Sequence, residues 1–126
     1  MFEKLKILYI EDSENDAVLM THHLKSICQN IQYNRVESKP ELGEILKKEN
    51  WDVIIIDNAL PSMTALDAIS LIKKKEVDIP MVCVSGSGMF DIKDQCIEAG
   101  AKAFILKDNS KEFVKVIEEI LKQCFG

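Results

Sequence analysis

The stretch Val53-Ile54-Ile55-Ile56-Asp57 decides the fold. Four consecutive β-branched apolar residues are typical of a strand buried on both faces, and such strands belong to parallel sheets covered by helices. The run then ends on a carboxylate. Because ligands of open parallel sheets bind beyond the carboxyl ends of the strands, this position directs Asp57 toward a functional site.

Polar residues also follow three other apolar runs. The run at residues 5–10 leads directly into Glu11 and Asp12, the run at 81–84 into Ser85 and a glycine-rich loop, and the run at 103–106 into Lys107. The glycine-rich loop lacks the spacing of a P-loop or of a dinucleotide-binding loop. The tips of four predicted strands therefore carry acids, a hydroxyl and an ammonium group.

Helical patterns lie between the strands. A capping pattern, Ser13 to Asp16, predicts a helix that runs to near Asn30, and residues 31–36 alternate apolar and polar as an edge strand does. Further helices are predicted from Ser38, after Pro61, from about Phe90 to Gly100, and from Asn109 or Ser110 to the end. Five strands alternating with five helices predict one doubly wound α/β domain over residues 1–126, flavodoxin-like, with strand order 2-1-3-4-5.

Composition narrows the function classes. The chain is 47% hydrophobic and 29% charged with a net charge of -5, which is typical of a soluble globular domain and disfavours direct nucleic-acid binding. No apolar stretch approaches the roughly 20 residues of a membrane helix. Four cysteines lack metal-site spacing and fall at predicted core positions, which favours a reducing compartment: Cys28, Cys83, Cys96 and Cys124. We therefore expect a cytoplasmic protein without membrane insertion.

The predicted strand order makes the first and third strands neighbours, so Glu11, Asp12 and Asp57 should meet in one crevice. Three carboxylates repel one another unless a cation lies among them, and oxygen ligands in a shallow, wet site suit Mg²⁺. With Ser85 and Lys107 alongside, the set matches phosphoryl transfer to an aspartate. Asp57 would attack phosphorus while Mg²⁺, the lysine and the hydroxyl stabilise the transferred oxygens.

The chain resembles a response-regulator receiver domain over its whole length. The resemblance rests on four motifs: Glu11-Asp12, Asp57 with Leu60-Pro61-x-Met63, Ser85-Gly86, and Gly100-Ala101-x-x-Phe104-x-x-Lys107. It implies a stand-alone receiver without an output domain. Such a protein catalyses only its own phosphorylation and dephosphorylation.

The resemblance also implies roles for individual residues. Asp57 would accept a phosphoryl group from a histidine kinase or a histidine phosphotransfer protein. Asp12, Asp57 and the backbone carbonyl of Ala59 would bind Mg²⁺, with Glu11 acting through water.

Ser85 and Phe104 resemble the family's switch pair, in which the hydroxyl moves inward and the ring follows. The surface of the fourth helix, fifth strand and fifth helix would then change its downstream partner. The protein would be a monomer or a phosphorylation-dependent dimer.

Several positions depart from the family pattern. Asp108 follows Lys107 where the family usually has proline, Ala65 stands where glycine is common, and Ala59 and Ser87 are small at positions that influence phosphoaspartate lifetime.

Two other functions are compatible with parts of the sequence. One alternative is an adaptor that is never phosphorylated. The other is a phosphohydrolase with an aspartate nucleophile, but such enzymes need a second acid two residues later, where this chain has alanine.

Overall fold

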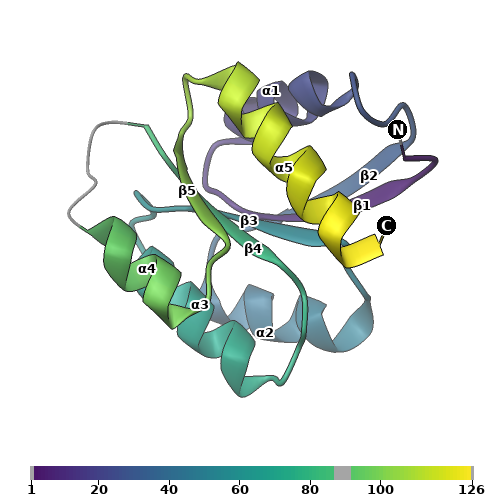
Figure 1. The fold of residues 1–126 in the computed structure, drawn as a ribbon. Coiled ribbons are helices and arrows are strands. Elements are labelled where there is room, and N and C mark those ends of the chain that lie inside the picture. Colours follow the sequence, from purple (N-terminus) through teal and green to yellow (C-terminus); the bar gives the residue numbers. More distant parts are fainter. Residues whose placement is uncertain (1, 87–91, 126) are drawn as a thin grey trace.

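The computed structural model describes residues 2–86 and 92–125, in which five strands alternate with five helices (Figure 1). The strands form one parallel sheet in the order β2-β1-β3-β4-β5, so the predicted doubly wound, flavodoxin-like fold is confirmed. The elements are β1 (Leu5–Ile10), α1 (Glu14–Leu24), β2 (Ile31–Val36), α2 (Lys39–Lys48), β3 (Val53–Asp57), α3 (Ala65–Lys74), β4 (Met81–Ser85), α4 (Lys93–Ala99), β5 (Ala103–Leu106) and α5 (Ser110–Phe125).

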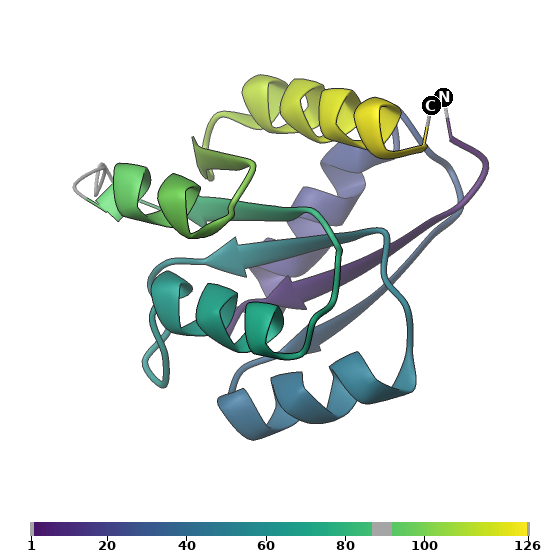
Figure 2. The same ribbon diagram turned by 60° about the horizontal axis from the view of Figure 1, so that its bottom comes forward.

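Helices cover both faces of the sheet (Figure 2). One hydrophobic cluster lies between the sheet and helices α2, α3 and α4, and a second lies between the sheet and helices α1 and α5. Successive residues of a strand alternate between the clusters: Ile54 and Ile56 face the first, whereas Val53 and Ile55 face the second. This two-sided burial is why the central strand reads as an unbroken apolar run.

The register of β3 with its neighbours sets the geometry of the sheet edge. Ile10 of β1 pairs with Ile56 of β3, so the residues that follow them, Glu11 and Asp57, come side by side. On the other flank, Asp57 pairs with Val84 of β4. The edge strand β2 alternates partly buried and exposed residues over its first five positions, as its sequence predicted.

Helix α1 is shorter than predicted. It ends at Leu24 rather than near Asn30. The hydrogen-bond pattern changes there, because the N–H of Lys25 donates to the carbonyl of His22, three residues earlier, as in a 3₁₀ turn. Cys28 is buried as predicted, and so is Ile27, but both lie in the connection between α1 and β2. The apolar spacing thus continues past the last helical residue.

At the edges of two other elements, one prediction is corrected and one lies partly outside the described residues. Helix α4 begins at Lys93, with Ile92 as its N-cap, and the predicted start at Phe90 lies outside the described residues. Gly100 ends this helix with φ of 129°, in the region that favours glycine. Cys124 is exposed, whereas the other cysteines are buried, because the last turn of α5 lines an open cavity rather than the core.

Candidate functional site

Three carboxylates meet at the carboxyl ends of β1 and β3, as the strand order predicted. Carboxylate oxygens of Glu11, Asp12 and Asp57 all lie within 4.8 Å of one another. Glu11 and Asp57 are buried and Asp12 is exposed, so the cluster has a closed floor and an open side. An exposed side of this kind leaves room for an ion that keeps several of its waters.

Lys107 places a positive charge among these acids. Its Nζ lies 2.6 Å from Oε1 of Glu11 and 3.4 Å from Oδ2 of Asp57. It also lies 2.7 Å from Oδ2 of Asp16, a residue of α1 that the sequence did not single out for the site. Burial disfavours the charged ammonium, but the hydrogen bond with Asp16, the close contact with Glu11 and the charge of Asp57 outweigh it and raise the pKa of Lys107.

Glu11 is the most deeply buried acid of the cluster, with 1% of its surface exposed. Burial raises the pKa of Glu11 to about 7, and the charge of Asp57 adds to the effect, while Lys107 and the N–H of Ser13 oppose it. Oε2 accepts the N–H of Ser13 at 3.1 Å. Within the described residues Oε1 has no aligned hydrogen bond, although it forms the close ion pair with Lys107. This oxygen therefore has capacity left for a water or an ion.

The loop after β3 orients Asp57. Oδ1 of Asp57 accepts the N–H of Ala59 at 3.1 Å, and the N–H of Asn58 donates to the carbonyl of Val84 at 3.0 Å. These bonds fix the carboxylate against the start of the loop and hold the loop against β4. Ala59 is exposed, and the expected role of its backbone carbonyl as a metal ligand stays a prediction.

Ser85 and Phe104 lie on the neighbouring strands. Ser85 ends β4, and its backbone carbonyl accepts the N–H of Lys107 at 2.8 Å, which ties the lysine to the serine through the main chain. Phe104 is buried in the cluster that includes Cys96 of α4. The Lys107–Asp108 peptide is trans, and Ser87 lies outside the described residues.

Arg35 is a second residue that the sequence analysis missed. Its Nη1 donates to the carbonyl of Glu11 at 3.2 Å, from the neighbouring strand β2. The same nitrogen lies 3.4 Å from the carboxylate of Glu37. Arg35 thereby braces the backbone of the acidic turn from the side opposite Lys107.

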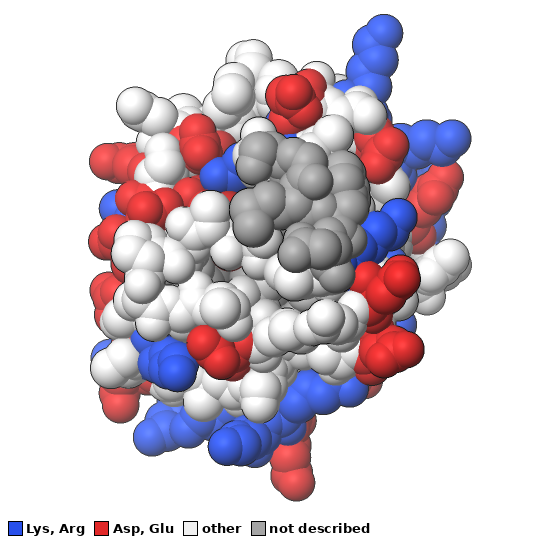
Figure 3. Space-filling view, turned by 90° about the vertical axis from the view of Figure 1, so that its left-hand side faces the viewer, with Lys and Arg blue, Asp and Glu red and all other residues white. Residues whose placement is uncertain are grey.

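The face at the carboxyl ends of the strands carries many acidic side chains along one part and uncharged residues over much of the rest. Figure 3 views it directly: Asp and Glu side chains gather along its left part, with basic atoms in their midst. The acid cluster and Lys107 lie at this end of the sheet, where Nζ of Lys107 is 2.6 Å from Oε1 of Glu11. Within residues 2–86 and 92–125, none of the helices has the length and apolar character needed to cross a membrane.

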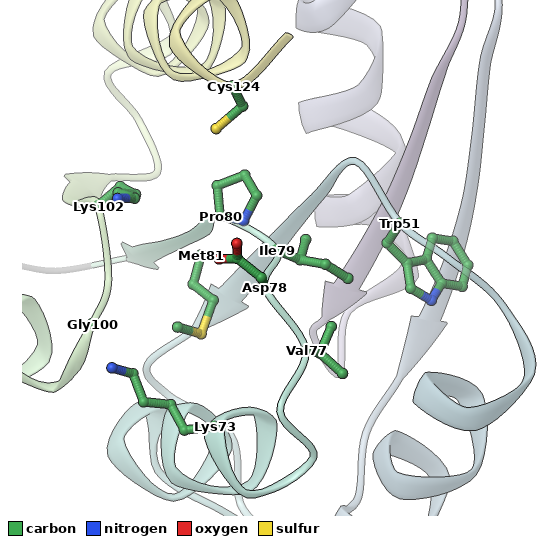
Figure 4. A pocket seen from close by; sticks show the side chains of 10 residues that line it. All are labelled: Trp51, Lys73, Val77, Asp78, Ile79, Pro80, Met81, Gly100, Lys102 and Cys124. Carbon is green, nitrogen blue, oxygen red and sulfur yellow. The ribbon is translucent and has the colours of Figure 1, made fainter.

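A cavity of about 650 Å³ lies elsewhere, at the amino ends of the strands (Figure 4). It is lined by Trp51, which precedes β3, by Met81 at the start of β4, and by Lys73, Lys102 and Cys124 from other elements. Trp51 is buried at the end of the sheet opposite the acids, because it directly precedes β3. This cavity holds no group of the acid cluster, so we place the chemistry at the other end of the sheet.

Sequence comparison finds one family across most of the chain. A family model for the response regulator receiver domain matches residues 7–118. The regulatory protein LuxO of Vibrio cholerae is 27% identical over 107 residues, which are 85% of this chain and 23% of the relative. The cell cycle transcriptional regulator CtrA of Caulobacter vibrioides is 27% identical over 124 residues, 97% of this chain and 52% of the relative. The chain thus spans from 23% to 52% of the length of these relatives.

Solved structures share the fold. The signal receiver domain of a LuxO repressor protein from Vibrio parahaemolyticus superposes with a TM-score of 0.82 at 22% identity, covering 95% of this chain and 92% of that one. The receiver domain of a sensor histidine kinase from Pseudomonas aeruginosa gives a TM-score of 0.73 at 19% identity, covering 95% and 96%. That second structure holds a magnesium ion in its active-site cleft.

Proposed function

Because this chain belongs to the response regulator receiver domain family, we propose that it is a phosphoacceptor switch of two-component or phosphorelay signalling. Asp57 accepts a phosphoryl group from a phosphohistidine on a histidine kinase or a histidine phosphotransfer protein. The observation that carries the proposal is the setting of Asp57. Its buried carboxylate lies 3.4 Å from the Lys107 ammonium group and within 4.8 Å of two other acids.

The proposed transfer is a substitution at phosphorus. A carboxylate oxygen of Asp57 forms the new P–O bond while the P–N bond to the donor imidazole breaks, and the imidazole keeps the electron pair and takes up a proton. The Lys107 ammonium group neutralises charge on the transferred oxygens, and the Ser85 hydroxyl donates to one of them. Attack by water later releases inorganic phosphate, so the chain acts only on its own phosphoryl group and not as an enzyme on other substrates.

The acid cluster fits Mg²⁺. Its three carboxylates supply the hard oxygen ligands that this ion prefers, and Oε1 of Glu11 is buried without an aligned hydrogen bond in the described part of the chain. Asp12, Asp57 and the backbone carbonyl of Ala59 would hold the ion, and Glu11 would act through water. When bound, Mg²⁺ would supply positive charge that lowers the repulsion between Asp57 and the incoming phosphoryl group.

The output of the switch is a protein surface. In the proposal, Ser85 follows the phosphoryl group inward and the Phe104 ring adjusts with it, which changes the surface of α4, β5 and α5 and its downstream partner. Buried Phe104 contacts the cluster that contains α4 residue Cys96, and this packing supports a link between the ring and that helix. The protein would work in the cytoplasm, where ATP-dependent kinases act, as a monomer or as a phosphorylation-dependent dimer.

The proposal is tested by intact mass after incubation with acetyl phosphate, with Mg²⁺ or with EDTA. We expect one phosphoryl adduct that needs Mg²⁺ and is absent in Asp57→Asn. The matched control is Asp78→Asn, at the amino ends of the strands, which should take up the adduct like the wild type. An adduct that persists in Asp57→Asn would rule out Asp57 as the acceptor.

A second donor separates the proposal from the adaptor alternative. If acetyl phosphate leaves the wild type unmodified, the chain is incubated with a histidine-phosphorylated phosphotransfer protein. Transfer from that donor would support the proposal, because some acceptors take the group only from a protein. Failure of both donors would favour an adaptor that binds its partners without phosphorylation.

A further inference from the structure

Lys107 makes its second-shortest contact with a residue outside the acid cluster. Oδ2 of Asp16, in the first turn of α1, lies 2.7 Å from the lysine Nζ, within the ordinary range of a charged hydrogen bond. The contact with Asp57 is longer, at 3.4 Å, which exceeds that range. In this resting arrangement the ammonium group is therefore held closer to α1 than to the proposed acceptor.

The local sequence explains why Asp16 faces the lysine. Ser13 caps α1 by accepting the N–H of Asp16 at 3.1 Å, which is half of a capping box. The other half would need the Asp16 carboxylate to accept the N–H of Ser13, but Glu11 already accepts that N–H at 3.1 Å. The cap of α1 is thus completed by Glu11, and the Asp16 carboxylate is left to bind Lys107.

The same chain contains a full capping box for comparison. At the start of α3, Thr64 accepts the N–H of Asp67 at 3.1 Å, and the Asp67 carboxylate accepts the N–H of Thr64 at the same distance. Among residues 2–86 and 92–125, no carboxylate other than that of Asp67 accepts this N–H. The difference between α1 and α3 therefore comes from Glu11, which links the helix cap to the acid cluster.

We propose that Asp16 is a positioning residue that competes with the phosphoryl group for Lys107. This inference rests on the proposed function. A phosphoryl group on Asp57 adds about 1.5 to 2 negative charges beside the lysine and draws the ammonium group toward it. Asp16 is 43% exposed, so water can solvate its carboxylate once the lysine leaves. On phosphorylation, Lys107 thus loses its partner Asp16 on α1 and gains the phosphoryl group on Asp57 at the end of β3.

The competition lowers the affinity of the site for a phosphoryl group. Part of the binding free energy is used to separate Lys107 from Asp16, so removing the Asp16 carboxylate should strengthen binding. A partly exposed ion pair of this kind corresponds to about a two- to fivefold change in affinity. Lys107 remains paired with Glu11 in either case, because that contact lies within the buried cluster.

The test is a titration of the full chain with beryllofluoride and Mg²⁺, a phosphoryl mimic, followed by ¹⁹F NMR. Asp16→Asn should bind about two- to fivefold more tightly than the wild type. Glu14→Gln removes an exposed acid from the same turn of α1 and should leave the affinity unchanged. Asp16→Glu restores a carboxylate and should return the affinity to near the wild-type value.

A second readout follows the lysine itself in the protein without beryllofluoride. The ¹⁵N signal of the Lys107 ammonium group, assigned by its loss in Lys107→Met, should move in Asp16→Asn and stay in place in Glu14→Gln. An unmoved lysine signal, or unchanged affinity in Asp16→Asn, would overturn the inference while the proposed function stands. A wild type that takes up neither beryllofluoride nor a phosphoryl group would overturn both.

Discussion

Replacing Lys107 with methionine isolates the effect of its charge. Methionine keeps an unbranched side chain but removes the only ammonium group that the described residues place among Glu11, Asp16 and Asp57. Without metal, the buried acids would then repel one another with no internal counter-charge. We expect Lys107→Met to destabilise the metal-free protein, and Mg²⁺ to relieve much of the loss.

The magnitude follows from burial. Removing one partner of a buried ion pair costs about 3 to 5 kcal/mol. Lys107 is 17% exposed and Asp16 is much more exposed, so we expect a smaller loss, about 2 to 3 kcal/mol in EDTA. In urea this lowers the midpoint of unfolding by about 1 to 2 M. Excess Mg²⁺ should narrow the gap to the wild type, because the ion replaces the missing positive charge.

The assay is urea unfolding followed by circular dichroism, in EDTA and in excess Mg²⁺. Lys6→Met is the matched control. Its ion pair with Glu49 is 2.8 Å long, and the two side chains are 30% and 39% exposed, so its loss should cost at most about 1 kcal/mol and be independent of Mg²⁺. Equal losses in the two lysine variants would refute the reasoning. So would a loss at Lys107 that excess Mg²⁺ leaves unchanged.

Three further predictions concern stability. Because the pKa of Glu11 is raised to about 7 in the folded protein, its contribution to stability is present at low pH and lost as the pH rises through about 7. In EDTA the urea midpoint should fall between about pH 5 and pH 8, and Glu11→Gln should flatten that fall. Gly100→Ala should cost about 1 to 2 kcal/mol from its positive φ alone. The new Cβ would also lie 2.5 Å from Cε of Lys73, so adding Lys73→Ala should recover only the steric part in thermal unfolding. Thr64→Ala should lower the free energy of unfolding by about 0.5 to 2 kcal/mol, because it removes the cap of α3. Thr64→Ser keeps a hydroxyl and should retain most of that stability in the same thermal unfolding assay.

The sheet and the acid cluster could be predicted because they depend on strand order. Once β1 and β3 are neighbours, residues that follow their apolar runs must meet at one edge, and this places Glu11 beside Asp57. Helix ends were less predictable. The apolar spacing of α1 continues through Ile27 and Cys28, which are buried in turns, and spacing cannot show that Cys124 lies where α5 borders an open cavity.

Asp16 and Arg35 were missed for different physical reasons. Asp16 lies three residues after Ser13, and that spacing is typical of an acid that caps its own helix. Asp16 binds Lys107 instead because Glu11 accepts the N–H of Ser13, and the spacing does not show this. Arg35 lies on an edge strand, where alternation predicts only partial exposure. Its hydrogen bond to the Glu11 carbonyl depends on the direction of a long side chain, which the sequence pattern does not encode.

In the part of the chain that the structure describes, the two hydrophobic clusters share no residue, because the sheet separates them and each strand side chain belongs to one side. Phe104 and α4 belong to one cluster, whereas Ile105, α1 and α5 belong to the other. Substitutions in separate clusters add in their effects when they share no partners. During evolution, core residues packed beneath α4 can therefore be exchanged without compensating changes in the core between α1 and α5. The two sides of the sheet can vary independently in their packing, even though the proposed partner surface draws on both.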